Sequence, residues 1–353
     1  MKLSSQLPVS LMFFKHWDLS DREVGVALAK AVFRRRRDGS FRALPAPDIV
    51  LEDSFAGDDP AWSPLAQEQE IAPGKEGTDL VIHAVARAPE GRARTDWPVA
   101  VEVPDRLHYG FHVRGPAVWT HRRLTGWQRQ EPELVSEVPL TYALAYGGQA
   151  PGPDDSVMMH AANPAGIGFV TPELLARHED IPIPQIGNLA EFMVDDPSTQ
   201  MTLHGTGPIA KTWQPRLGHA GTFDETWERE RHPRMPKDYS LRFWNVAQGP
   251  LRLDPPLSGA EEVRVTGIST APEPVCVQLP RVACTLAAQG PEAQDSLPMV
   301  LDTVTLDLAD PDPLTHTATL LWRVQVPGPD RFVQGEVLST QIPADTTPPL
   351  QEA

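Results

Sequence analysis

Hydrophobic and polar residues alternate along several short stretches of this chain, near both ends of the sequence. In residues 79–86 both alternating sets of side chains are mostly apolar, which is typical of a central strand that packs on two sides. Similar short runs follow at intervals of about ten residues. They are residues 99–103, 109–113 and 116–119, then 263–265, 275–279, 300–308 and 317–326. This succession of short strands and turns predicts a β-sandwich or a barrel.

Residues 23–33 are compatible with two structures. Ser20 and Asp21 could cap a helix, and the alanines that follow favour one. Val24, Val26 and Leu28 nevertheless alternate, as they would in a strand that ends before a turn. The local pattern alone leaves helix and strand open.

The middle of the chain, residues 151–256, is rich in Pro, Gly, Trp and Asp, and has few runs long enough to be strands. Two short helices are predicted there. Thr171 and Pro172 form a cap and a first-turn proline for residues 174–178. Thr222 and Glu225 have the spacing of a capping box and open a helix that runs to Arg231.

Composition sharpens this picture of a loop-rich β protein. The chain has 353 residues and 38 prolines, against roughly 18 expected from average usage. Each proline inside a helix would cost about 3 kcal/mol, so long helices and coiled coils are excluded. We therefore expect a mainly β protein with two packed antiparallel sandwich-like regions, residues 1–150 and 257–337. The loop-rich segment 151–256 joins them with one or two short helices, and residues 338–353 are expected to form a disordered tail.

The charge and the cysteine count restrict the partners and the compartment. The chain has 31 basic and 47 acidic residues, for a net charge of −16. Such a surface repels nucleic acids and anionic membranes and suits a basic protein client. No secretory signal or membrane-spanning stretch is recognisable, so a cytoplasmic location is expected. Cys276 and Cys284 could pair across a turn or remain free thiols, and so small a number fits a reducing compartment.

Sequence motifs for catalysis, metal binding and phosphate binding are missing. The chain has no His-Glu-x-x-His, no Gly-x-Ser-x-Gly and no complete dinucleotide loop. The segment Gly205–Gly207 begins like a dinucleotide-binding loop, but Pro208 follows it and ends the match. We therefore expect no enzyme activity, no metal and no cofactor. A hydrolytic site assembled from distant carboxylates would need no local motif and stays open.

The middle segment carries the residue types that dominate binding surfaces. Tryptophan, tyrosine and arginine recur there beside prolines that stiffen the loops. The alternative interpretation is that these side chains pack long loops onto the sheets. The candidate partner-binding residues are Trp213, Arg216, Phe223, Asp224, Trp227, Asp238 and Trp244.

Several motifs resemble a bacterial family catalogued as domain of unknown function 2169, and together they extend over roughly residues 22–327. The early motifs are Gly77-Thr78-Asp79, Pro139-Leu140-Thr141-Tyr142 with Tyr146-Gly147-Gly148, and Asn163-Pro164-x-Gly166-x-Gly168-Phe169. The later ones include Trp213-x-Pro215-Arg216, Ala220-Gly221-Thr222-Phe223-Asp224, Phe243-x-Asn245-x-Ala247, Leu301-Asp302-Thr303-Val304 and Leu321-Trp322-Arg323. The family has a strand where Lys30-Ala31-Val32-Phe33 stands here, so the resemblance favours a strand for residues 23–33. The chain departs from the family at Asp238-Tyr239-Ser240, where a second acidic residue is usual.

The resemblance implies a function in type VI secretion. The family is associated with these systems, and its members are expected to be non-enzymatic chaperones or adaptors. Such a protein would bind a secreted effector and help to load it onto the VgrG–PAAR spike. Two alternatives remain: a hydrolase acting on polysaccharide or peptide with a site in residues 160–245, and a structural component of the spike.

Overall fold

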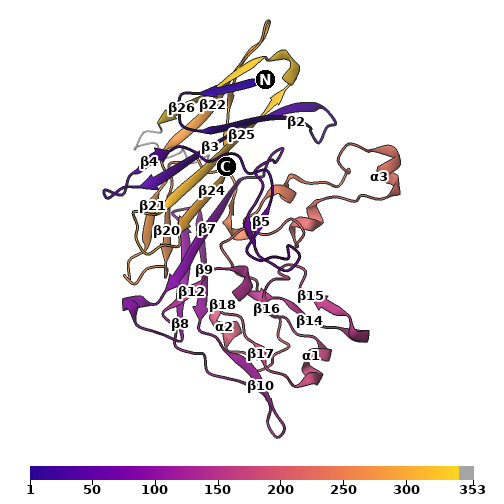
Figure 1. The fold of residues 1–353 in the computed structure, drawn as a ribbon, viewed down its shortest axis with the longest axis vertical. Helices are drawn as coiled ribbons and strands as arrows, with labels where there is room; N and C mark the ends of the chain where they lie inside the picture. The colour runs from indigo at the N-terminus through magenta and orange to yellow at the C-terminus, as the bar shows by residue number, and fades with distance from the viewer. Residues whose placement is uncertain (342–353) are drawn as a thin grey trace.

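The largest element of the computed structural model, which describes residues 1–341, is an eight-stranded sheet (Figure 1). Its six-strand path runs in the order β12-β7-β24-β25-β3-β2, with β19 added beside β7 and β4 beside β3. The strands are β2 (Ser10–Trp17), β3 (Glu23–Arg35), β4 (Phe41–Leu44), β7 (Thr78–Arg87), β12 (Glu137–Pro139), β19 (Arg252–Leu253), β24 (Val300–Leu308) and β25 (Thr317–Pro327). The prediction of a mainly β protein is confirmed.

Two further sheets share a hydrophobic core with one face of this sheet. One has five strands in the order β18 (Ile186–Gly187), β9 (Leu107–Arg114), β8 (Asp96–Val103), β20 (Glu262–Thr266) and β21 (Val275–Gln278). The other has four, β1 (Lys2–Ser5), β26 (Gln334–Gln341), β22 (Val282–Gln289) and β23 (Gln294–Pro298). Alternation assigns the faces: Leu320 and Trp322 of β25 are buried in this core, while Leu321 and Arg323 face the other way.

The first and last parts of the chain meet inside the same sheet. β7 pairs with β24 in parallel, and β3 pairs with β25 along eleven residues. The segments 1–150 and 257–337 therefore contribute neighbouring strands to one sheet. Dividing the chain into consecutive regions, as the sequence suggested, does not reveal this pairing. Residues 23–33, for which the local pattern left two structures open, lie within β3.

The end of the chain departs from the expected boundary of the tail. β26 pairs with β22 up to Gln341, so residues 338–341 belong to a strand and not to a disordered tail. The ladder of backbone hydrogen bonds to β22 explains this difference, because it extends the sheet past the last apolar residues. The remainder of the expected tail, residues 342–353, lies outside the described residues.

The middle segment and the residues just before it, together residues 118–256, form small elements at the lower end of the molecule and on its right side in Figure 1. The strands are β10 (Val118–Arg122) with β11 (Gly126–Arg129) and β17 (Ile181–Pro182), β13 (Tyr146–Gly147) with β16 (Ile167–Gly168), and β14 (Gln149–Pro151) with β15 (Val157–Met159). The α-helices are α1 (Pro172–Arg177), α2 (Leu189–Phe192) and α3 (Glu225–Glu230). The 3₁₀ turns there are η2 (Tyr142–Leu144), η3 (Pro153–Asp155), η4 (Arg216–His219), η5 (Leu241–Trp244) and η6 (Gly249–Leu251). Elsewhere in the described chain, η1 (Pro89–Gly91) follows β7 and η7 (Pro329–Arg331) follows β25.

Of the two helix caps expected from the sequence, the structure has the one at Thr171 but not the one at Thr222. The Thr171 side chain accepts a hydrogen bond from the Leu174 amide and caps α1 as expected. At α3 the cap is Asp224, whose carboxylate accepts from the Trp227 amide at 2.8 Å. Thr222, the expected cap, instead donates its hydroxyl to Asp238. A carboxylate caps a helix at least as well as a threonine, and Asp224 directly precedes the first helical residue, so it replaces Thr222 as the N-cap. Trp227 then occupies the third helical position, where a capping box needs Glu or Gln, so α3 has no such box.

Both cysteines are free thiols, and burial raises the pKa of Cys284 to about 12.

Within residues 1–341, none of the helices has the length and apolar character needed to cross a bilayer.

Burial lowers the pKa of five histidines, so the fold should lose stability in mild acid. They are His16, His83, His160, His204 and His316. The unfolded chain binds protons at these histidines near pH 6.5, whereas the folded chain does so only at lower pH. Their contribution is therefore present above about pH 6.5 and lost as the pH falls toward the folded pKa values.

We expect urea denaturation to give a smaller free energy of unfolding near pH 5.5 than near pH 7.5. His204 is 7% exposed and lies 3.1 Å from the Tyr109 hydroxyl, so His204→Gln should lose less stability over this interval than the parent does. Leu124→Ala, at a side chain that is 96% exposed and carries no titratable group, is the control and should lose as much as the parent. Equal stability of the parent at both pH values would contradict the expectation.

Candidate functional site

The outer face of the eight-stranded sheet carries a cavity of about 490 Å³. Residues 47–74, which we call the strap, lie over this face and include the short hairpin β5 (Ser54–Phe55) and β6 (Leu65–Gln67) (Figure 1). Ile49 of the strap packs on Leu28 and Leu321 of the sheet. The cavity lies between the strap and strands β7, β24, β25 and β3.

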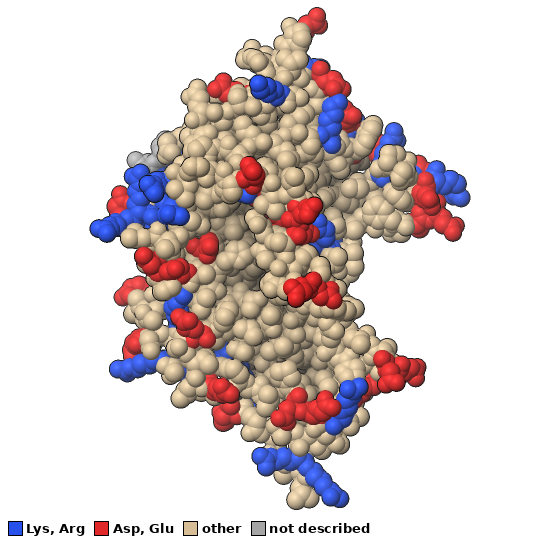
Figure 2. All heavy atoms as spheres, in the orientation of Figure 1, with Lys and Arg blue, Asp and Glu red and all other residues tan. Residues whose placement is uncertain are grey.

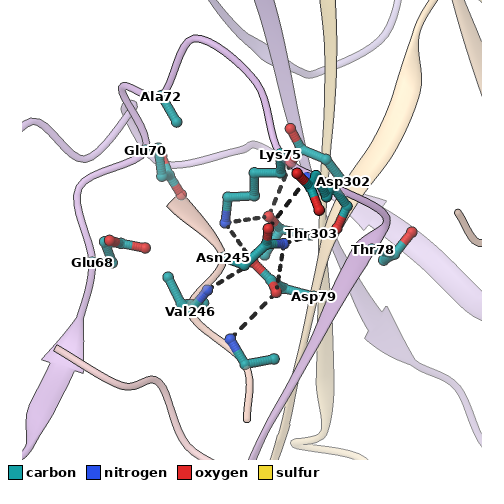
Figure 3. A network of polar contacts seen from close by, with 12 residues as sticks. Glu68, Glu70, Ala72, Lys75, Thr78, Asp79, Asn245, Val246, Asp302 and Thr303 are labelled. Carbon is teal, nitrogen blue, oxygen red and sulfur yellow. Dashed lines mark hydrogen bonds and ion pairs between the residues drawn. The ribbon is translucent and has the colours of Figure 1, made fainter. Parts of the chain in front are cut away.

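One side of the cavity is formed by a network of buried charges around Asp79 (Figure 3). The Asp79 carboxylate is fully buried and pairs with Lys75 at 2.9 Å. It also accepts from three donors that follow η5: Asn245 Nδ2 at 3.1 Å, the Val246 amide at 2.9 Å and the Ala247 amide at 3.3 Å. Lys75 donates to the Thr303 hydroxyl, which donates in turn to Asp302. The network therefore fastens β7, β24 and the segment after η5 to one another.

The strap is held down by a second set of buried ion pairs. Glu70 pairs with Lys30 of β3 at 2.8 Å and accepts from the Val50 amide. Arg323 of β25 donates to the Ala72 and Glu70 carbonyls and pairs with Asp302 at 3.2 Å. Unpaired, each of these buried charges would be expensive, so their pairing fixes the strap in one position.

Glu68 joins the strap to the middle segment through Arg216, and both side chains are more than nine-tenths buried. Burial raises the pKa of the Glu68 carboxyl, although Arg216 and Lys75 favour its charged form. Arg216 also donates to the Phe243 carbonyl at 2.9 Å and to the Ile209 carbonyl. This pair is therefore a structural joint between the strap and the middle segment.

A second feature is a projecting arm, which we define as residues 220–240. It carries α3 and extends from the right side of the body in Figure 1. Arg231 holds its base through two hydrogen bonds to the Asp21 carboxylate, at 2.7 and 2.8 Å. Asp238 accepts from both the amide and the hydroxyl of Thr222. These contacts fix the loops on either side of α3 in one conformation.

The arm exposes a row of aromatic rings. Phe223 is 56% exposed and meets Trp227 edge to face, with ring centroids 4.7 Å apart. Trp227 meets His232 in the same manner at 5.3 Å and donates its indole N–H to the Arg234 carbonyl. In Figure 2 an open notch separates the arm from the lower part of the molecule. Large, exposed and rigidly held aromatic rings are typical of binding hot spots.

The structure divides the seven candidate residues into three groups. Phe223, Asp224 and Asp238 are exposed on the arm, and Trp227 is half-buried beside them. Trp244 is half-buried at the end of η5, where its indole N–H donates to the Tyr239 hydroxyl. Asp224 and Asp238 already have partners within the arm, and they position Trp227 and Thr222.

Trp213 and Arg216 are corrections, because both lie in the interior. Trp213 is 1% exposed and packs edge to face on Tyr142. Arg216 is 2% exposed and is held by Glu68. Tryptophan and arginine are common both at interfaces and in the packing under long loops. Their identity alone therefore could not separate the two roles, and burial excludes direct contact of these two side chains with a partner.

Sequence analysis missed the members of the buried network that come from the strap and the nearby strands. Lys30 and Glu70 are examples, separated by 40 positions and joined only by the fold. Two signals could have found them. Lys30 interrupts an apolar run, and a charge that is buried there needs a partner of opposite sign. The strap contains seven carboxylates and no Lys, Arg or His, so the positive partners of its carboxylates must come from elsewhere in the chain.

The contact between Arg231 and Asp21 provides a test of how rigid the arm is. Asp21→Ala should leave two guanidinium donors without their charged acceptor and loosen the arm. We expect faster amide hydrogen exchange in residues 222–238 and unchanged exchange in β7 and β25. Glu23→Ala removes the nearby exposed pair with Lys15 and is the control, expected to leave exchange in the arm as it was. Unchanged exchange in Asp21→Ala would show that other contacts hold the arm.

Comparison with known proteins gives one match. A family model described as "Uncharacterized protein conserved in bacteria (DUF2169)" matches residues 20–323. No curated protein and no solved structure matches the chain. The match includes the strap, the buried network and the arm.

Proposed function

We propose, from the premise that the chain belongs to this bacterial family, DUF2169, that it is a non-enzymatic adaptor. In this proposal it binds an effector of the type VI secretion system in the cytoplasm and helps to load it onto the VgrG–PAAR spike. The secretion process is inferred from the resemblance to the family. The binding of an effector is inferred from the exposed aromatic side chains of the arm.

The observation that supports this function best is the rigid row of Phe223, Trp227 and His232 on the arm. Exposed aromatic rings lose little conformational entropy on binding when the loops that carry them are already fixed. Asp21 and Asp238 provide this fixation through their bonds to Arg231 and Thr222. The arm is therefore suited to hold another protein without rearranging.

The charge distribution supports a basic client. With a net charge of −16, the protein would attract a positively charged effector over distances of about a Debye length, roughly 8 Å at physiological salt. The same charge disfavours nucleic acid and anionic lipid as partners.

Co-expression with a type VI effector from the same bacterium tests the proposal. We expect a complex that survives size-exclusion chromatography, and a lower steady-state level of the effector when this gene is deleted. Absence of a complex, together with an unchanged effector level in the deletion strain, would overturn the adaptor function. A complex that assembles stoichiometrically with the purified spike would instead support the second alternative, a structural component of the spike.

The hydrolase alternative requires a cleft with two facing carboxylates, and both of them should belong to residues 160–245. Glu68 and Glu70, the buried carboxylates beside the cavity, come from the strap, and each is paired with a cation. Carboxylates held in this way are occupied with positioning the strap. This is why we propose binding and not catalysis.

A further inference from the structure

The cavity under the strap is separate from the arm and has the volume of a ligand site. Its volume of about 490 Å³ falls within the range of roughly 300–1,000 Å³ typical of such sites. Figure 2 shows a hollow in the middle of this face. The adaptor function, as argued from the arm, makes no use of it.

The floor of the cavity is a ladder of hydroxyl groups on two neighbouring strands. Thr305 of β24 lies opposite Thr319 of β25, and Thr317 lies opposite Asp307. Asp307 in turn lies beside His83 of β7 in the parallel register. Hydroxyls both donate and accept, so this floor can bond the alternating N–H and C=O groups of an extended peptide.

The lining excludes two other kinds of ligand. Among the described residues that line the cavity there is no Phe, Tyr or Trp, so a sugar ring or a base would find no aromatic face on which to stack. The buried charges of the lining are paired within the protein: Lys30 with Glu70, and Lys75 with Asp79. Arg323, the remaining cation of the described lining, pairs with Asp302, so none of the cations in that lining is left over to hold a phosphate.

Exposed carboxylates of the strap and of the loop that follows β24 favour a positively charged ligand. Of the seven carboxylates of the strap, Glu68, Glu70 and Asp53 are paired with Arg216, Lys30 and Lys211. Asp307 of β24 lines the cavity and is exposed. The remaining strap carboxylates, Asp48, Glu52, Asp58 and Asp59, are exposed as well, and so are Asp310 and Asp312 in the loop that follows β24. In Figure 2 red side chains border the hollow, whereas a dense group of blue ones lies at the left edge.

We propose that this cavity binds an extended peptide segment of the partner protein that carries lysine or arginine side chains. The peptide backbone lies on the threonine ladder, and its cationic side chains reach the carboxylates of the strap and of residues 307–312. This deepens the adaptor function by naming the chemistry of the client segment, and it rests on that function.

Titration calorimetry with defined probes tests the proposal on the full-length protein. The probes are the hexapeptide Gly-Ser-Lys-Thr-Lys-Ser, blocked at both ends, and its analogues with Gln or Glu at both lysine positions. At low salt we expect the lysine peptide to bind about tenfold tighter than the glutamine peptide, and the advantage to shrink as salt is added. Equal binding of the two, or tighter binding of the glutamate peptide, would overturn it.

Variants locate the binding on the cavity. Thr305→Val with Thr319→Val removes two hydroxyls at nearly constant volume and should weaken lysine-peptide binding at least about fivefold. Asp307→Asn tests the rim without touching the core and should reduce the preference for lysine over glutamine. Phe223→Ala with Trp227→Ala, on the arm, should bind the peptide as the parent does. Unchanged binding in both cavity variants would place the peptide elsewhere and overturn the proposal.

The two proposals fail in distinguishable ways. A stable complex with the effector but no discrimination among the peptides would overturn only the cavity site. Discrimination among the peptides without any complex with the effector would retain the cavity as a peptide site and overturn the adaptor function.

Discussion

Replacing Asp79 by asparagine should destabilise the fold by about 3–5 kcal/mol, the effect expected when one partner of a buried ion pair is removed. Asp79 is fully buried, and Lys75 is 6% exposed. The variant leaves the Lys75 ammonium without its counter-charge. It also places an amide N–H₂ group among donors that include Asn245 and the Val246 amide. Urea denaturation of the purified variant measures the loss.

The matched control is Glu23→Ala, which removes an ion pair whose two side chains are 43% and 40% exposed. Solvent screens such a pair, so this variant should unfold at nearly the urea concentration of the parent. A shift of Asp79→Asn as small as that of the control would contradict the view that the network fastens the sheet to the middle segment.

Replacing Phe223 and Trp227 together by alanine should nearly abolish binding of the effector. Buried aromatic hot spots contribute about 2 kcal/mol or more each, so each substitution is expected to weaken binding at least about 30-fold. Phe223 is 56% exposed in the free protein and Trp227 is half-buried, so the loss of stability should be small. Surface-bound effector titrated with each variant measures the affinity.

A control for the arm is Leu124→Ala, because Leu124 is 96% exposed in the turn between β10 and β11. This variant loses an exposed apolar side chain from another surface and should bind the effector like the parent. If the double variant of the arm also bound like the parent, the aromatic row would not be the binding surface.

The strands of this fold were predictable where alternation was clear. The expected strand 300–308 coincides with β24, and the expected strand 317–326 ends one residue before β25 does. Alternation could not indicate that β7 and β24 pair in parallel, because more than 200 positions separate them. A parallel pair has no hairpin that would mark it in the sequence.

The candidate site was predictable only in part, for the same reason. Phe223 and Trp227 were found because aromatic side chains that recur among prolines in one segment are a local signal. The ion pairs Lys30–Glu70 and Arg216–Glu68 join segments that are distant in the sequence, so no local pattern marks them. Trp213 was assigned to the surface because its residue type fits both environments, and only the packing on Tyr142 decides between them.

Amide hydrogen exchange of this protein with and without its effector tests the central claim most directly. The claim is that the arm, residues 220–240, holds the client. We predict that binding slows exchange most strongly in this segment, around α3, while β8 and β9 exchange as in the free protein. Protection confined to segments outside the arm, with exchange in residues 220–240 unchanged, would contradict the claim.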